Sequence, residues 1–302
     1  MRLFGQRTGL LGFAMVLVSV AAARLPAQTM SAAPVELVRE TVQNEINSSN
    51  PIKFMFRERE QTEHGTQTKV IVQTKEVAAG MLVAINDKPL TVEERQKEQG
   101  RLDGLVNNPE ELKKKEKADK EDTEHTNRIM RALPDAFLYE PDGVQVGTKE
   151  MGNPGDELVR LKFRPNPDYS APSHVEQVLT GMVGYMLIDK SQRRIAKIDG
   201  TLEKEVGFGW GILGRLDKGG RFVVQQGTME TGEWQLTRMQ LDLTGKILFF
   251  KKLVIKSTQT FSDFHQAPPN LTFAQGVELL KKQAQELAEN RPETAGAERS
   301  QR

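Results

Sequence analysis

The sequence predicts an α+β fold built around one antiparallel β-sheet. Strand-length apolar runs fill residues 182–264, and short loops rich in Gly, Asp and Lys join them. Strands joined by such short loops pair as antiparallel neighbours, because parallel neighbours need long crossover connections. Outside one charged segment, only two stretches have the apolar spacing of an amphipathic helix, so helices are expected to cover the sheet but not to build the fold.

The late strands form a predicted meander. Their expected ranges are 182–189, 194–202, 221–226, 233–243 and 246–257. Earlier strands are expected at 52–59, 68–75, 81–85, 136–139, 144–147 and 158–163. The first two of these form a hairpin across His64-Gly65. The two amphipathic helices are expected at 35–46 and 273–287. Prolines 165, 167 and 172 exclude a central strand in the crossing that leads to the meander.

Residues 1–27 have the pattern of a cleavable export signal. Arg2 and Arg7 precede an apolar run from 10 to 20, and small residues follow it up to Ala27. This run is too short for a membrane span, and no later segment is as apolar, so no transmembrane span is expected in the mature chain. The chain has no cysteine, which excludes disulfides and thiolate metal sites. We expect a periplasmic or secreted protein, and an exported chain without disulfides fits a bacterial envelope.

The charge balance argues against nucleic acid as a partner. Cleavage after Ala27 would leave 39 basic residues against 41 acidic ones. Phosphate binding normally needs a basic face, and a slightly acidic mature chain gives no reason to expect one. A polyanionic surface is an unexpected target for the same reason.

Residues 91–133 form a charged helical insertion. Positions 91–131 hold 11 acidic and 10 basic residues with few apolar ones, and Asn107-Asn108-Pro109 interrupts the run. Pairs such as Glu111 with Lys115 support a solvated helix. We interpret this segment as an exposed helical arm rather than a binding element.

The late strands have no polar face. In 182–188 both the even and the odd positions are apolar, and 247–255 behave similarly. A sheet wetted on one side would alternate apolar and polar residues. Two amphipathic helices can cover only one face well. The other face is therefore expected to fold on itself or to enclose a cavity.

No motif in the sequence establishes catalysis. Residues 209–214 read Gly-Trp-Gly-Ile-Leu-Gly and match the dinucleotide fingerprint, but predicted antiparallel strands flank them where the fingerprint needs a strand followed by a helix. The four histidines are scattered and follow no metal-binding spacing. No nucleophile elbow is present, and no carboxylate pair can be nominated. We therefore expect neither an enzyme nor a cofactor.

The order of the elements resembles the periplasmic outer-membrane lipoprotein-sorting superfamily, which contains the lipoprotein carrier and its receptor. The stretches that carry the likeness are 161–169, 184–189, 194–198, 234–236 and 261–264, within 35–264. The resemblance implies an open half-barrel, meaning a strongly curved antiparallel sheet with covering helices and a hydrophobic cavity for acyl chains. It divides the chain into a signal peptide (1–27), a carrier-like domain (31–265) and a C-terminal helix with a polar tail (266–302). The charged insertion has no counterpart in the minimal carrier.

These observations predict a non-catalytic envelope protein that binds a lipid or lipoprotein acyl chain. The expected cavity lining consists of Phe54, Phe56, Val183, Tyr185, Leu187, Ile195, Phe222, Val224, Trp234, Leu236, Phe249 and Leu253. Both faces of the strands are apolar, so the sequence does not decide which of them lines the cavity. One alternative is a module with a filled core that binds another envelope protein, and a second is an exported hydrolase.

Overall fold

The computed structural model describes residues 29–48, 52–208, 214–247 and 251–289. The predicted leader and Phe249 lie outside these ranges. The helices are α1 (Thr29–Asn47), α2 (Val92–Val106), α3 (Pro109–Ala136), α4 (His174–Gln177) and α5 (Phe273–Glu289), with a 3-10 helix, η1 (Val178–Gly181). None of the helices in the described part of the chain is both long and apolar enough to cross a membrane.

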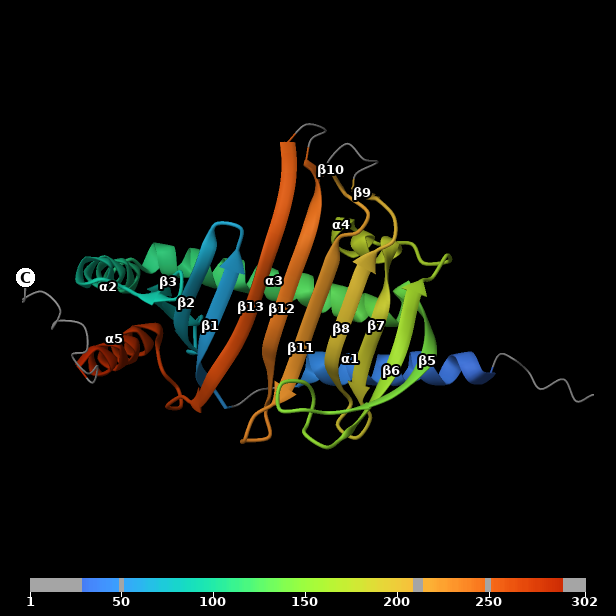
Figure 1. Cartoon of the computed structure of the whole chain (residues 1–302), viewed down its shortest axis with the longest axis horizontal. Helices are drawn as coiled ribbons and strands as arrows, with labels where there is room; N and C mark the ends of the chain where they lie inside the picture. Colours follow the sequence, from blue (N-terminus) through green and yellow to red (C-terminus); the bar gives the residue numbers. More distant parts are fainter. Residues whose placement is uncertain (1–28, 49–51, 209–213, 248–250, 290–302) are drawn as a thin grey trace, which may run out of the picture.

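One antiparallel sheet of 13 strands organises the molecule (Figure 1). The strands are β1 (Phe54–Thr62), β2 (Gly65–Val72), β3 (Ala79–Ile85), β4 (Lys88–Pro89), β5 (Phe137–Val146), β6 (Glu157–Pro165), β7 (Met182–Asp189), β8 (Arg194–Leu202), β9 (Val206–Phe208), β10 (Gly214–Leu216), β11 (Arg221–Thr228), β12 (Trp234–Ile247) and β13 (Lys251–Gln266). Their order is β4-β3-β2-β1-β13-β12-β11-β8-β7-β6-β5, and β9 and β10 form a hairpin beside β12. The sheet does not close, because β4 and β5 are its two edges. The helices and the antiparallel order of the strands confirm the predicted α+β class and the meander.

One local expectation differs from the structure. The separate strands expected at 136–139 and 144–147 are one edge strand, β5, whose register against β6 shifts between Pro141 and Val144. An edge strand tolerates this proline because one side of it donates no ladder hydrogen bond. The segment leading into the meander, 174–181, forms the short helices α4 and η1.

The charged insertion forms two capped helices. Thr91 accepts a hydrogen bond from the Glu94 backbone N–H at 3.2 Å, and the Glu94 carboxylate accepts one from the Thr91 N–H at 2.8 Å. The Asn108 side chain accepts a bond from the Glu111 N–H at the start of α3. Asn108 and Pro109 thus end one helix and begin the next, as the sequence predicts.

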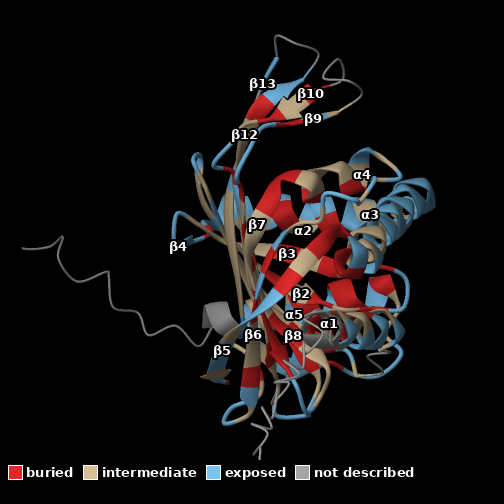
Figure 2. Cartoon of the chain, turned by 90° about the vertical axis from the view of Figure 1, so that its right-hand side faces the viewer, coloured by how far each residue is buried: buried red, intermediate tan, exposed pale blue. Residues whose placement is uncertain are grey.

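At one end of the sheet helices cover a single face, while the loop around Met151 and Gly152 covers the buried Leu158 and Leu187 on the other. Met186 and Ile188 on β7 are fully buried in a core that includes Val38 of α1 and Leu133 of α3. Leu187, which lies between them in sequence, belongs to a separate cluster with Trp234. We call the face that carries Met186 the inner face and the face that carries Leu187 the outer face. Figure 2 shows α1 and α3 on the same side of the sheet.

At the other end of the sheet, α5 packs on β2 and β3 from the outer side. Its Gly276 lies against Thr74 and Val72 so closely that any side chain there would meet them. Residues directly opposite on neighbouring strands share a face. A path of such pairs leads from Val70, which packs against α5, to Leu187, and therefore places α5 on the outer face. The path is Val70↔Arg57, then Arg59↔Thr260, Thr260↔Arg238, Arg238↔Gln225, Gln225↔Lys197 and Lys197↔Leu187, where Arg57 and Arg59 share a face because they are two residues apart on β1. The two well-spaced amphipathic helices therefore cover opposite faces at opposite ends, not one face together.

Helix α3 bridges the two covered ends. Leu112 packs against the α5 cluster, whereas Ile129 and Leu133 pack beneath β5–β8. Between them, all residues from 113 to 126 are exposed except the half-buried Glu116. This stretch from Leu112 to Ile129 is roughly 26 Å long at 1.5 Å per residue. Figure 1 shows α3 behind β11, β12 and β13, so it crosses the middle of the sheet without packing into a core there.

Candidate binding surfaces

The inner face of the middle strands carries a strip of half-buried apolar side chains. Val224 on β11 lies opposite Ile198, which lies opposite the buried Met186, so the register places Val224 on the inner face. The strip, which we call the inner strip, consists of Phe222, Val224, Met239, Leu241, Leu243, Leu253 and Ile255. Each of these residues is only partly buried, although the same face is fully buried a few strands away.

An aromatic group adjoins the inner strip where β13 meets β1. The Phe56 ring stacks on Phe264 with centroids 5.1 Å apart, and it meets Phe261 edge-on at 6.0 Å. Phe54 meets Phe264 edge-on at 6.2 Å and is itself buried. These rings extend the apolar surface to the N-terminal end of β1.

Two carboxylates follow the aromatic group on the same face of β1. Gln259 donates a hydrogen bond to Glu58 at 3.3 Å, and Ser257 donates one to Glu60 at 3.1 Å. Burial raises the pKa of Glu58, Lys69 acts against this shift, and the neighbouring Glu60 adds to it. The inner face is therefore apolar along the inner strip and polar where Ser257 and Gln259 of β13 meet Glu60 and Glu58 of β1.

The twelve residues predicted to line a cavity do not share one face. Phe54, Phe56, Ile195, Phe222, Val224 and Leu253 belong to the inner side. Val183, Tyr185 and Leu187 lie on the outer face of β7, and Trp234 packs in the cluster that contains Leu187. Leu236 is half-buried beyond a bulge in β12, and Phe249 lies outside the described residues. The sequence analysis missed Met239, Leu241 and Ile255. Met239 and Leu241 alternate with polar residues and could have been found from that alternation, whereas Ile255 follows the apolar Val254 and could not.

Outside the buried cluster of Leu187 and Trp234, the outer face is polar and highly charged. Lys197 donates a hydrogen bond to the Tyr185 hydroxyl at 2.6 Å, and Arg221 donates two bonds of 3.1 and 3.0 Å to Asp199. Burial acts to raise the pKa of Asp199, but hydrogen bonds from Arg221 and Lys197 lower it overall. Arg160 stacks on the Tyr185 ring, with its guanidinium carbon 3.9 Å from the ring centroid.

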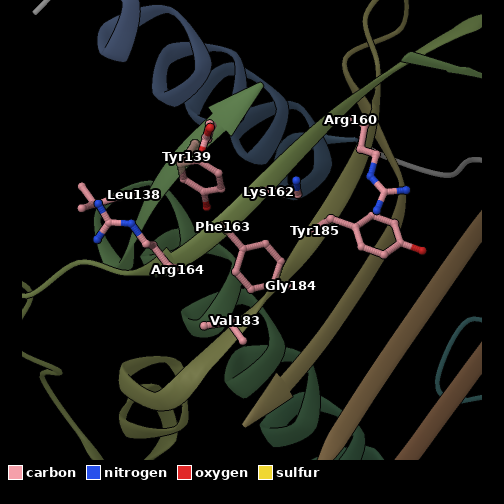
Figure 3. A pocket seen from close by; sticks show the side chains of 10 residues that line it. Leu138, Tyr139, Arg160, Lys162, Phe163, Arg164, Val183, Gly184 and Tyr185 are labelled. Atoms are coloured by element: carbon pink, nitrogen blue, oxygen red, sulfur yellow. The ribbon is translucent and has the colours of Figure 1, made fainter. Parts of the chain in front are cut away.

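An open pocket of about 470 Å³ lies on this face over β5, β6 and β7 (Figure 3). Arg160, Lys162 and Arg164 alternate along β6 at its margin, and Val183 and Tyr185 belong to its lining. Asp142 accepts from Lys162 at 2.7 Å and pairs with Arg160 at 2.8 Å, and these contacts lower its pKa. The pocket combines aromatic and aliphatic surface with three cations and one carboxylate, Glu140.

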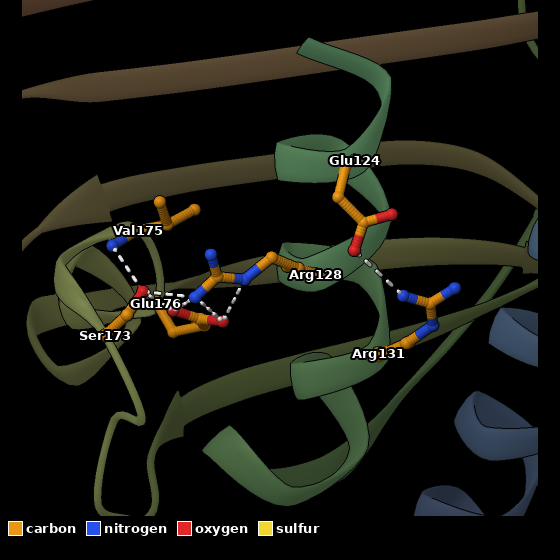
Figure 4. A network of polar contacts seen from close by, with 6 residues as sticks. All are labelled: Glu124, Arg128, Arg131, Ser173, Val175 and Glu176. Carbon is orange, nitrogen blue, oxygen red and sulfur yellow. Dashed lines mark hydrogen bonds and ion pairs between the residues drawn. The ribbon is translucent and has the colours of Figure 1, made fainter. Parts of the chain in front are cut away.

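A buried ion pair fastens the C-terminal half of α3 to α4 (Figure 4). Arg128 donates to both carboxylate oxygens of Glu176, at 3.0 and 3.1 Å, and also to the Ser173 hydroxyl. Only 3% of Glu176 is exposed. Burial acts to raise the pKa of Glu176, but the bonds from Ser173 and Arg128 lower it overall. This contact holds α3 at the covered end of the sheet.

The structure gives the glycine-rich motif a different setting from a dinucleotide site. Phe208 precedes the motif and Gly214 is its last residue. The two are antiparallel partners in the β9–β10 hairpin. A dinucleotide site needs a helix at this point, because its N-terminus meets the pyrophosphate. Within the described residues, no three His, Asp or Glu side chains form a group that could hold a metal ion.

No protein-family model and no curated protein matches this chain. Solved structures to which the chain is similar include an outer-membrane lipoprotein-sorting domain from Vibrio parahaemolyticus, at 8% identity and a TM-score of 0.30, covering 82% of this chain and 97% of that one. They also include a DUF1329 family protein from Desulfovibrio piger, at 8% identity and a TM-score of 0.27, covering 81% and 95%. The first bears the name of the superfamily that the sequence resembles. Likeness at this level carries no argument about function.

Proposed function

We propose that the protein is an exported, non-catalytic envelope protein that binds the acyl chain of a lipid or lipoprotein on its inner strip. The observation that carries this proposal is the partial burial of Val224, Met239 and Leu241, on a face that is a closed core at the β5–β8 end. Large apolar patches left partly open on a protein surface commonly mark binding sites.

An acyl chain suits the inner strip because both are elongated and apolar, with the polar Ser257 and Gln259 bordering the strip on β13. Lying between the inner strip and α3, the chain would remove methylenes from water at roughly 0.8 kcal/mol each. Part of that free energy offsets the ordering of the chain and the loss of its free motion. The exposed charged side of α3 would remain in water, so the helix can act as a cover without burying its own charges.

Export is the second part of the proposal, and it rests on the leader pattern of residues 1–27. A periplasmic or secreted protein with an acyl-chain site would carry hydrophobic cargo through an aqueous compartment. No catalytic step is included, because binding alone explains the apolar strip.

A photoreactive fatty acid tests the site directly. Delipidated protein should bind it saturably, and crosslinks should fall on β11–β13 around Met239. Met239→Glu places a charge in the strip and should weaken binding at least tenfold, whereas Gln240→Glu adds the same charge on the outer face of the same strand and should leave binding unchanged.

Two results would count against the acyl-chain site. Saturable binding could be absent altogether, which would favour the alternative of a protein-interaction module with another envelope protein as partner. Crosslinks could instead fall on outer-face residues such as Val183, with Met239→Glu binding as the wild type does. The second result would keep a lipid ligand but move its site.

A further inference from the structure

The outer face of the sheet gathers basic side chains that the overall charge of the chain conceals. Strand register and alternation place them together on β1, β6, β8 and β11–β13. This set, which we call the basic face, consists of Arg57, Arg59, Arg160, Lys162, Arg164, Lys197, Arg221, Arg238, Lys246, Lys252 and Lys256. The acidic residues that share these positions on β5, β8 and β12 are fewer, namely Glu140, Asp142, Asp199 and Asp242.

The acidic residues do not neutralise the basic face. Asp142 is shared by Arg160 and Lys162, and Asp199 is shared by Lys197 and Arg221. Glu140 lies opposite Lys162, and Asp242 lies opposite Arg221, so these two sites are near neutral and the surplus positive charge comes from the other cations of the face. Arg57 and Arg59 pair with Asp263 and Asp87. The remaining cations, which form no ion pair with any described residue, are Arg164, Arg238, Lys246, Lys252 and Lys256.

Two of these lysines are placed directly against each other. Lys246 on β12 and Lys252 on β13 are opposite partners in the register, and both are exposed. Like charges directly opposite on neighbouring strands are destabilising. An anion lying across the pair would remove the repulsion, so the position favours an anionic partner.

The basic face also contains a recess of the right size for an anionic group. The pocket of about 470 Å³ over β5–β7 is lined by three cations, Arg160, Lys162 and Arg164, against one carboxylate, Glu140, while Tyr185 and Val183 supply apolar surface (Figure 3). A phosphate with a short apolar attachment matches this combination of guanidinium groups and aliphatic surface.

We propose that the basic face docks the protein on the surface of an anionic phospholipid bilayer, with a lipid headgroup phosphate in the β5–β7 pocket. The cations are spread over many strands of an open sheet, and the helices α1 and α3 lie on the other side (Figure 2). A broad one-sided field of positive charge fits a partner whose negative charges are spread over a plane. This proposal does not depend on the acyl-chain site, because the two use opposite faces.

Vesicle flotation tests the docking face. The full mature chain should bind vesicles of phosphatidylglycerol and phosphatidylcholine in equal parts, and should not bind pure phosphatidylcholine. Each basic residue near an anionic surface contributes roughly a fivefold factor to partitioning. The triple variant Arg164→Gln, Lys252→Gln, Lys256→Gln should therefore bind about a hundredfold more weakly. Binding should also disappear at 1 M salt, where the Debye length is about 3 Å.

A matched control separates the face from net charge. Lys113→Gln, Lys115→Gln, Lys120→Gln removes the same charge from exposed positions on α3 and should leave vesicle binding unchanged. An equal loss in both triple variants would overturn the proposal. So would binding to heparin in solution without binding to vesicles, which would indicate a soluble polyanion. Fatty-acid labelling around Met239 should persist in the triple variant of the basic face. The acyl-chain site and the bilayer-docking face can therefore be tested separately.

Discussion

The inner face presents similar apolar side chains at the β5–β8 end and on β11–β13, but the two regions are covered differently. Under α1 and the end of α3, Met186 and Ile188 are inaccessible to water, while Met239 and Leu241 on the same face are only half-buried. The difference lies in the helix that crosses them. Burial therefore depends here on what packs against a strand and not on the strand's own sequence.

Helix α3 explains this contrast through its own composition. Its last turns supply Ile129, Met130 and Leu133 to the core, whereas residues 113–126 are almost all charged or polar and remain exposed. A charged side chain cannot enter an apolar core without a partner at an acceptable free energy. The helix can therefore seal one region and only pass over the other.

Paired methionine truncations give the largest expected difference between the two regions. Met186→Ala should lower the free energy of unfolding by about 3 kcal/mol, because it leaves a cavity in a closed core. Met239→Ala should lower it by about 1 kcal/mol or less, because that side chain is already partly in water. Urea denaturation measures both, and equal losses would mean that the inner strip is as closed as the core.

The second largest effect is expected from removing the Arg128–Glu176 ion pair, which attaches α3 at the covered end of the sheet. Arg128→Ala leaves the Glu176 carboxylate buried without its partner and should lower the free energy of unfolding by about 2 kcal/mol. Arg131→Ala breaks the exposed pair with Glu124, which Figure 4 shows beside it, and should have an effect of about 0.5 kcal/mol or less.

The loss in Arg128→Ala should depend on pH. The folded protein lowers the pKa of Glu176 below its ordinary value of 4.5, so the pair stabilises the fold above that pH. Its contribution is lost as the pH falls through the lowered pKa. Denaturation curves at pH 7 and in acid would show the difference between variant and wild type shrinking. A pH-independent difference would assign the loss to packing of the arginine stem.

The smallest expected effect concerns the polar end of the inner face. Burial raises the pKa of Glu58, so the folded state binds its proton more tightly than the unfolded state does. This carboxylate therefore opposes folding at neutral pH, and Glu58→Gln should raise the free energy of unfolding by about 0.5 kcal/mol. The gain should fade as the pH falls through the raised pKa of Glu58 and be absent below 4.5, where the carboxyl is protonated in both states. A destabilised variant at pH 7 would show that Lys69 outweighs the burial.

Much of the fold is predictable because strand rhythm is a local property. The ranges 182–189 and 194–202 match β7 and β8, and the helix expected from 273 matches the start of α5. The joining of the first hairpin to β13 is not predictable in this way, because pairing between strands distant in sequence leaves no periodic signal. The same limit applies to α5, whose apolar stripe does not specify which face of which strands it covers.

The candidate surfaces were predicted only in part. The sequence identifies β11 and β13 as sources of an apolar surface, and it names Phe222, Val224 and Leu253 on it. It also groups them with Tyr185 and Leu187, which face the other way, because an apolar run on β7 does not reveal which parity a helix will cover.

By itself, the sequence determined the strands, their turns and the near balance of positive and negative charge, since these follow from neighbours along the chain. The tertiary structure alone decided that the positive charges collect on one face of the sheet while apolar side chains collect on the other. The physical reason is that alternation assigns each residue to a side, but register and bulges decide which residues of different strands stand on that side together.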